Sequence, residues 1–168
     1  IEIQQRTNPL ATSMSPDVDV VMGHEFCAEV IEYGPDTEGR VDTGSRVVSM
    51  PVLFGPSGIR SVGYSPTHPG GYGQYMVLTE GLLLPVPDDL STPMAALTEP
   101  MAVGRHAVEK ANLAAEDIPL VVGCGPVGLA VVAALRQKGA HPVIAADFSP
   151  RRRELAVAMG ADEVIDPA

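Results

Sequence analysis

The stretch 118–147, which reads IPLVVGCGPVGLAVVAALRQKGAHPVIAAD, places the strongest constraint on how this chain folds. An apolar run at 118–122 meets the glycine pattern G-x-G-x-x-G at 123–128, and an apolar helical run follows to Lys138. A second short apolar run then ends in Asp147, 19 residues after the last glycine. This order predicts a strand, a tight turn, a helix and a second strand that carries an acid at its end.

Each part of this unit has a physical reason to bind a dinucleotide. Gly123 allows the tight turn, Gly125 lets the backbone approach a pyrophosphate, and Gly128 lets the helix pack close to the strand. The helix N-terminus offers free N–H groups and a partial positive charge to phosphate, and proline suits its first turn. The alternative is a glycine-tolerant βαβ crossover without a ligand. The residues predicted to contact the cofactor are Gly123, Gly125, Pro126, Val127, Gly128, Asp147 and Arg152.

The residues around Asp147 bear on which cofactor binds. A carboxylate there accepts from the ribose 2′-hydroxyl and repels a 2′-phosphate, so it favours NAD over NADP. Three arginines at 151–153 leave three interpretations open: a 2′-phosphate clamp, a cation stacked near adenine, or a solvated helix face. Cys124 lies near the helix N-terminus, a position that predicts a lowered thiol pKa.

Composition limits the remaining classes of function. The net charge is −10 and the isoelectric point is about 4.7, which argues against binding of nucleic acid or of an anionic membrane. The chain has two cysteines, Cys27 and Cys124, and no CxxC motif, so a reducing cytoplasm fits. Residues 118–135 carry no charge, but their glycines and proline favour a strand plus a buried helix over a membrane span.

The 168 residues leave room for one domain or for parts of two. Residues 21–90 are predicted to form a small irregular β domain, with a long loop at 55–71. From residue 92 the spacing becomes helical, and residues 118–168 alternate strand and helix. The strands expected in the β domain lie at 26–33, 46–50, 72–79 and 82–86, and helices are expected at 101–111 and 151–159.

Two short segments contain candidate metal ligands. The first is Gly23-His24-Glu25, and the second is Leu97-Thr98-Glu99-Pro100 at the head of a predicted helix. A histidine, a carboxylate and one further ligand would suit a catalytic zinc with an open fourth position, but the third ligand is not evident from spacing. The alternatives are a surface or core histidine, a glutamate stabilised by the helix dipole, and a buried apolar role for Cys27.

Taken together, these segments resemble the zinc-containing alcohol dehydrogenases of the medium-chain dehydrogenase/reductase family. The resemblance runs from about residue 21 to the C-terminus and rests on motifs in family order. They are Gly23-His24-Glu25, Gly44-Ser45-Arg46-Val47-Val48, Gly70-Gly71-Tyr72-Gly73-Gln74-Tyr75-Met76-Val77, Glu99-Pro100-Met101-Ala102-Val103 and the 123–128 turn with Asp147.

The resemblance implies an α/β plus β protein: a partial GroES-like β domain at 1–98, a connecting helix at 99–117, and the first half of a doubly wound Rossmann sheet at 118–168. It implies hydride transfer between a small alcohol or polyol and NAD, with NADP less favoured, in a cytoplasmic homodimer or homotetramer. One catalytic zinc would be held by His24 and Glu99. Glu25 would be a catalytic residue that either contacts the zinc ligands without binding the metal or serves as an alternate ligand.

Three departures from the family pattern qualify this resemblance. No cysteine precedes His24, where the family has its first zinc ligand and a proton relay, and 52–71 lacks the structural-zinc cysteines. The sheet is also expected to stop after about three strands. These departures predict a fragment that binds zinc weakly and does not turn over by itself. The alternatives are a zinc-free quinone or enoyl reductase and a non-catalytic nucleotide-binding module.

Overall fold

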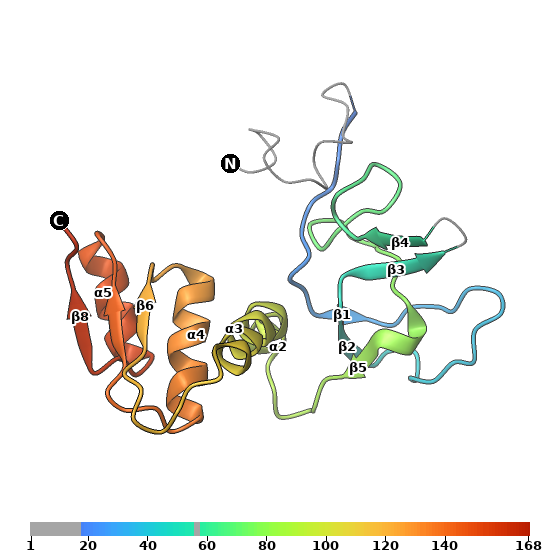
Figure 1. Ribbon diagram of the computed structural model, residues 1–168. Helices are drawn as coiled ribbons and strands as arrows, with labels where there is room; N and C mark the ends of the chain where they lie inside the picture. Colours follow the sequence, from blue (N-terminus) through green and yellow to red (C-terminus); the bar gives the residue numbers. More distant parts are fainter. Residues whose placement is uncertain (1–17, 56–57) are drawn as a thin grey trace. The chain divides into compact units, whose positions relative to one another are not determined.

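A computed structural model of the protein describes residues 18–55 and 58–168. The chain divides into two compact units, residues 1–99 and 100–168, and Figure 1 shows the elements of each. The predicted end of the β domain at residue 98 lies one residue from this division. The segment predicted to connect the domains is helical over α3 (Thr98–Ala111).

The first unit is built on short antiparallel strands. One sheet has the order β1 (Ala28–Glu29), β2 (Arg46–Ser49) and β5 (Leu83–Pro85). Val47 of the central strand lies opposite Ala28 on one side and Pro85 on the other, and its side chain is fully buried. Other elements of this unit are the hairpin β3 (Val52–Gly55) and β4 (Gly58–Ser61), the 3₁₀ helix η1 (Glu80–Leu82) and helix α2 (Thr92–Ala95).

Three sequence-based expectations for this unit are wrong. The strand expected at 26–33 pairs over two residues only, and none of the described strands lies in 72–79. The second segment begins with a turn in which the Gly73 N–H donates to the Gly70 carbonyl, and the side chains of Tyr72, Tyr75 and Val77 are exposed. The loop expected at 55–71 contains one strand of a hairpin, because Phe54 pairs with Ile59 and Gly55 pairs with Gly58.

The second unit is a parallel sheet with helical crossovers, as the sequence predicts. The strand order is β6 (Leu120–Val122), β7 (Ile144–Ala146) and β8 (Glu163–Ile165). Helix α4 (Pro126–Gln137) connects the first two strands, and α5 (Pro150–Ala158) connects the second and third. This is the first half of a doubly wound fold, so the predicted fold class is confirmed.

Small apolar residues form the core of the second unit. The buried cluster consists of Val108, Val121, Cys124, Val132, Ala134, Leu135, Val143, Ala145, Ala156 and Ala161. Helix α3 packs closely on α4, because a Cβ at Gly104 would lie 2.6 Å from the backbone carbon of Ala130. None of the helices in 18–55 and 58–168 is long and apolar enough to cross a membrane, and the uncharged stretch at 118–135 is a strand followed by a helix.

Candidate metal and dinucleotide sites

Close backbone packing fixes the segment that carries His24. The N–H groups of residues 70, 71 and 72 donate to the carbonyls of residues 21, 23 and 22 over 2.8, 2.9 and 3.0 Å. Gly23 has φ +105°, and a Cβ on Gly70 would collide with the Gly23 carbonyl oxygen. Side chains larger than hydrogen are therefore disfavoured at positions 23 and 70, and the His-Glu pair leaves this turn in a defined direction.

His24, Glu25 and Glu99 come together in the first unit. Each offers one ligand atom, and these three atoms all lie within 4.8 Å of one another. His24 and Glu99 are partly buried, whereas Glu25 is exposed. Glu99 is the second residue of α3, whose first residue, Thr98, donates its hydroxyl to the Ala95 carbonyl at 2.7 Å. This bond joins the end of α2 to the start of α3 and so restrains the position of Glu99.

The chemistry of this donor set fits a zinc ion. Zinc accepts imidazole nitrogen and carboxylate oxygen, and catalytic sites commonly have three protein ligands with a fourth position open. Two carboxylates and a neutral imidazole also balance the charge of a divalent cation. Spacing alone left the third ligand open, and Glu25 is the third donor that the fold brings to His24 and Glu99. Cys27 is not a member of this group; it is half-buried rather than buried, and burial raises the pKa of its thiol.

Tyr64 is a neighbour of His24 that sequence reasoning missed. Its hydroxyl lies 3.4 Å from His24 Nδ1, and the two rings are 5.7 Å apart at 33°. Both residues line a cavity of about 320 Å³ together with Met22, Gly23, Glu25, Gly63 and Tyr72. The sequence predicts a long loop over this segment; the glycine directly before the tyrosine, Gly63, has a left-handed φ of +78° in the structure.

In the glycine turn of the second unit, the fold requires glycine at two positions and does not require it at the third. Gly123 has φ +92°, and a Cβ on Gly128 would collide with the Gly123 carbonyl oxygen. Gly125 has φ −73°, which any residue adopts, and a Cβ there would meet no protein atom within 4 Å. The fold itself therefore explains Gly123 and Gly128, while Gly125 borders open space at the N-terminus of α4.

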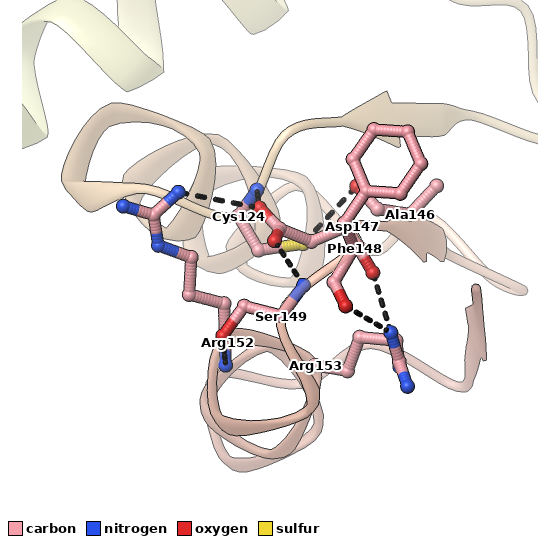
Figure 2. A network of polar contacts seen from close by, with 7 residues as sticks. All are labelled: Cys124, Ala146, Asp147, Phe148, Ser149, Arg152 and Arg153. Atoms are coloured by element: carbon pink, nitrogen blue, oxygen red, sulfur yellow. Dashed lines mark hydrogen bonds and ion pairs between the residues drawn. The ribbon is translucent and has the colours of Figure 1, made fainter. Parts of the chain in front are cut away.

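Asp147 is tied to the glycine turn by hydrogen bonds. Its Oδ2 accepts from the Cys124 N–H and its Oδ1 from the Ser149 N–H, both at 2.8 Å, and the residue is 8% exposed (Figure 2). The bond from Ser149 and then that from Cys124 hold the pKa of this carboxyl below its usual range. It is therefore ionised at neutral pH, and about four lone-pair positions leave room for further donors.

The three arginines of α5 have different surroundings. Arg151 is exposed and pairs with Glu154, as a solvated helix face predicts. Arg152 is also exposed, but its Nη1 lies 3.7 Å from Asp147 Oδ2. Arg153 is mostly covered, and its Nη1 donates to the carbonyls of Asp147 and Phe148 at 2.7 and 3.0 Å (Figure 2). Sequence reasoning did not distinguish these roles, because all three lie in one charged run.

The prediction of a lowered pKa for Cys124 is wrong. The side chain is fully buried, and its Sγ lies 3.6 Å from the Ala146 carbonyl oxygen. Burial raises the pKa of this thiol, and the nearby Asp147 carboxylate raises it further. Cys124 thus belongs to the core beneath the turn, where a thiol behaves as a small apolar group.

Comparison with known proteins agrees with this architecture. Residues 2–88 match the family described as the alcohol dehydrogenase GroES-like domain. The (R,R)-butanediol dehydrogenase of Bacillus subtilis is 38% identical over 177 aligned residues, which cover 97% of this chain and 48% of that protein. The erythritol/L-threitol dehydrogenase of Mycolicibacterium smegmatis is 35% identical, over 89% of this chain and 46% of that protein.

Solved structures show the same fold. The crystal structure of the Bacillus subtilis butanediol dehydrogenase superimposes with a TM-score of 0.77 over 95% of this chain and 47% of that one. A Sinorhizobium meliloti dehydrogenase described as zinc-binding, crystallised with NADP, is 26% identical with a TM-score of 0.83 over 99% of this chain and 50% of that one. The chain spans about half the length of the curated relatives it matches. The chain belongs to the medium-chain, zinc-containing alcohol dehydrogenase family.

Proposed function

We propose that the protein containing this chain is a zinc-dependent dehydrogenase that transfers hydride from a small alcohol or polyol to NAD. The observation that carries the proposal is the meeting of His24, Glu25 and Glu99, whose ligand atoms lie within 4.8 Å of one another. The named relatives act on diols and polyols, which supports a substrate with neighbouring hydroxyl groups. The family resemblance further supports the domain boundaries 1–98, 99–117 and 118–168, and a homodimer or homotetramer.

The chain's own residues have distinct tasks at the proposed metal site. His24 would donate a ring nitrogen, and Glu25 and Glu99 would each donate a carboxylate oxygen. A zinc ion held there would supply Lewis-acid chemistry, polarising the alcohol oxygen and lowering its pKa. The Tyr64 hydroxyl at Nδ1 would orient the imidazole and leave Nε2 for the metal. Glu25 is the exposed member of the three, which suits it to the role of an alternate ligand if zinc is held by His24 and Glu99.

The second unit would hold the adenosine half of the cofactor. The N-terminus of α4 would bind the pyrophosphate, with the contacts made at Gly123, Gly125, Pro126, Val127 and Gly128. The Asp147 carboxylate would accept from the ribose hydroxyl, and its negative charge disfavours a 2′-phosphate. Arg152, exposed beside this carboxylate, would lie over the same ribose.

A substrate panel tests this proposal. We expect NADH formation with butane-2,3-diol or erythritol, and a rate with NADP at least about 10-fold lower at equal concentration, because a charged hydrogen bond is worth about 1.5–3 kcal/mol. The measurement is the appearance of reduced cofactor, with simple monoalcohols as the comparison. A faster reaction with NADP would refute the preference for NAD and would indicate that Arg152 binds the 2′-phosphate.

The same panel separates the alternatives from the proposal. A zinc-free reductase would consume NADPH with quinones or enoyl substrates and would keep that rate after treatment with a chelator. A non-catalytic nucleotide-binding module would bind the cofactor and transfer no hydride in either direction. Either result would contradict the proposed dehydrogenase activity.

A further inference from the structure

Arg153 occupies a position that a solvated helix residue would not. Its side chain is 18% exposed, against 75% for Arg151 and 56% for Arg152. Its Nη1 contacts three oxygens: the carbonyls of Asp147 at 2.7 Å and Phe148 at 3.0 Å, and Asp166 Oδ2 at 3.0 Å. The guanidinium therefore joins the start of α5 to the chain that follows β7 and to the chain that follows β8.

These contacts act on the backbone that carries the proposed ribose-binding acid. The Asp147 carboxylate is held from one side by the N–H groups of Cys124 and Ser149. Its peptide is held from the other side by Arg153, which caps two successive carbonyls (Figure 2). The side chain of the following residue, Phe148, is 70% exposed and so adds little packing at this corner.

We propose that Arg153 is a positioning residue for recognition of the cofactor ribose. Its bonds to the carbonyls of Asp147 and Phe148 fix the two peptide groups that follow Asp147. They so hold the Asp147 carboxylate in the direction that meets the 2′-hydroxyl. The inference rests on the proposed function, because it assumes that Asp147 binds the ribose. All three contacts are made by the same terminal nitrogen, Nη1, and arginine suits this task better than lysine because its planar, pre-organised guanidinium holds that nitrogen in a fixed direction.

Arg153 and Arg152 are expected to influence the site differently. Arg152 lies 3.7 Å from the carboxylate itself and is exposed, so its effect is a screened charge interaction. Arg153 does not contact the carboxylate in any bond described for it, and acts through the backbone. Loss of Arg153 should therefore alter discrimination at the 2′-hydroxyl more than it alters the overall affinity for the dinucleotide.

Titration calorimetry with ADP-ribose and 2′-deoxy-ADP-ribose tests this inference on the purified protein. We expect the unaltered protein to prefer ADP-ribose by about 10- to 100-fold, the range for one charged hydrogen bond. Arg153→Met should reduce that preference to below about 3-fold, while affinity for the 2′-deoxy ligand stays within about 2-fold. Arg151→Met, on the same helix and equally charged, is the matched control and should keep the full preference.

Two further variants cover the case in which Arg153→Met fails to fold. Arg153→Lys keeps the charge but not the planar guanidinium. Asp166→Asn keeps the arginine but removes its ion pair. Both variants should give an intermediate preference for ADP-ribose. An unchanged preference in the Arg153 variants, or an equal loss for both ligands, would overturn the positioning role alone. Absence of any preference in the unaltered protein would overturn the ribose-binding role of Asp147, and the inference with it.

Discussion

In the full protein that contains this chain, replacement of His24 by alanine should release zinc and abolish alcohol oxidation together. His24 is the only nitrogen donor among the three grouped residues, and its loss leaves two carboxylates, one fewer than the three protein ligands that a catalytic zinc site commonly has. A structural zinc site is worth about 10–16 kcal/mol, so one of three or four ligands accounts for about 4 kcal/mol, or about 1000-fold in affinity. Metal content after dialysis, measured by atomic absorption beside the rate of NADH formation, gives the result.

His106→Ala is the matched control for this variant. His106 is an exposed histidine of α3, the helix that also carries Glu99, and it is not part of the metal-binding group. The control should retain zinc and full turnover. If His24→Ala instead kept its zinc and oxidised the alcohol normally, the assignment of His24 as a ligand would be wrong.

Valine at position 125 should remove dinucleotide binding while leaving the fold intact. Gly125 has ordinary extended backbone angles, and a Cβ there meets no protein atom within 4 Å, so the added side chain projects into the proposed pyrophosphate position. A steric conflict of about 3 kcal/mol or more corresponds to at least a 100-fold loss of affinity. Calorimetry with ADP-ribose measures this loss, and thermal unfolding measures the stability, which should change by about 1 kcal/mol at most.

Gly128→Val provides the contrast, because it lies in the same turn. Even a Cβ at this position collides with the Gly123 carbonyl oxygen, so the helix cannot keep its place on the strand. We expect this variant to lose several kcal/mol of stability or to fail to fold. Equal destabilisation by both substitutions, with ADP-ribose still bound by Gly125→Val, would contradict the division of the turn into structural and ligand-facing glycines.

The second unit was predictable because its signals are local. One apolar run, one glycine turn and one helical run follow each other directly, and each element pairs or packs with its neighbour in sequence. The ends of α5 are local features of the same kind. Ser149 caps its N-terminus, where the side chain accepts from the Arg152 N–H, and Gly160 follows its C-terminus. Short-range patterns of this type need no knowledge of distant partners.

The first unit was harder to predict because distant segments determine it. Residues 72–79 read as a strand in the sequence, yet the described residues give this segment no strand partner, and the side chains of Tyr72, Tyr75 and Val77 are exposed. The close approach of 21–23 to 70–72 depends on glycines far apart in sequence, at Gly23 and Gly70. Pattern reasoning found these glycines as parts of motifs but not as partners of one another.

The candidate site shows the same limit. His24 and Glu99 were identified through the resemblance to a family, whereas spacing alone gave two unrelated candidates. Tyr64 was missed because a tyrosine in a loop has no distinctive pattern, and its contact with His24 arises only from the fold. Arg153 could not be separated from its charged neighbours, because the difference lies in which way each side chain leaves α5.

The most direct test of the proposed function is the zinc dependence of alcohol oxidation. The full protein that contains this chain would be stripped of metal with a chelator and titrated with zinc, while NADH formation from butane-2,3-diol is followed. We expect activity to disappear on stripping and to return in proportion to added zinc, up to about one ion per chain for a single catalytic site. Full turnover by the stripped protein, with negligible zinc remaining, would contradict the catalytic role assigned to His24, Glu25 and Glu99.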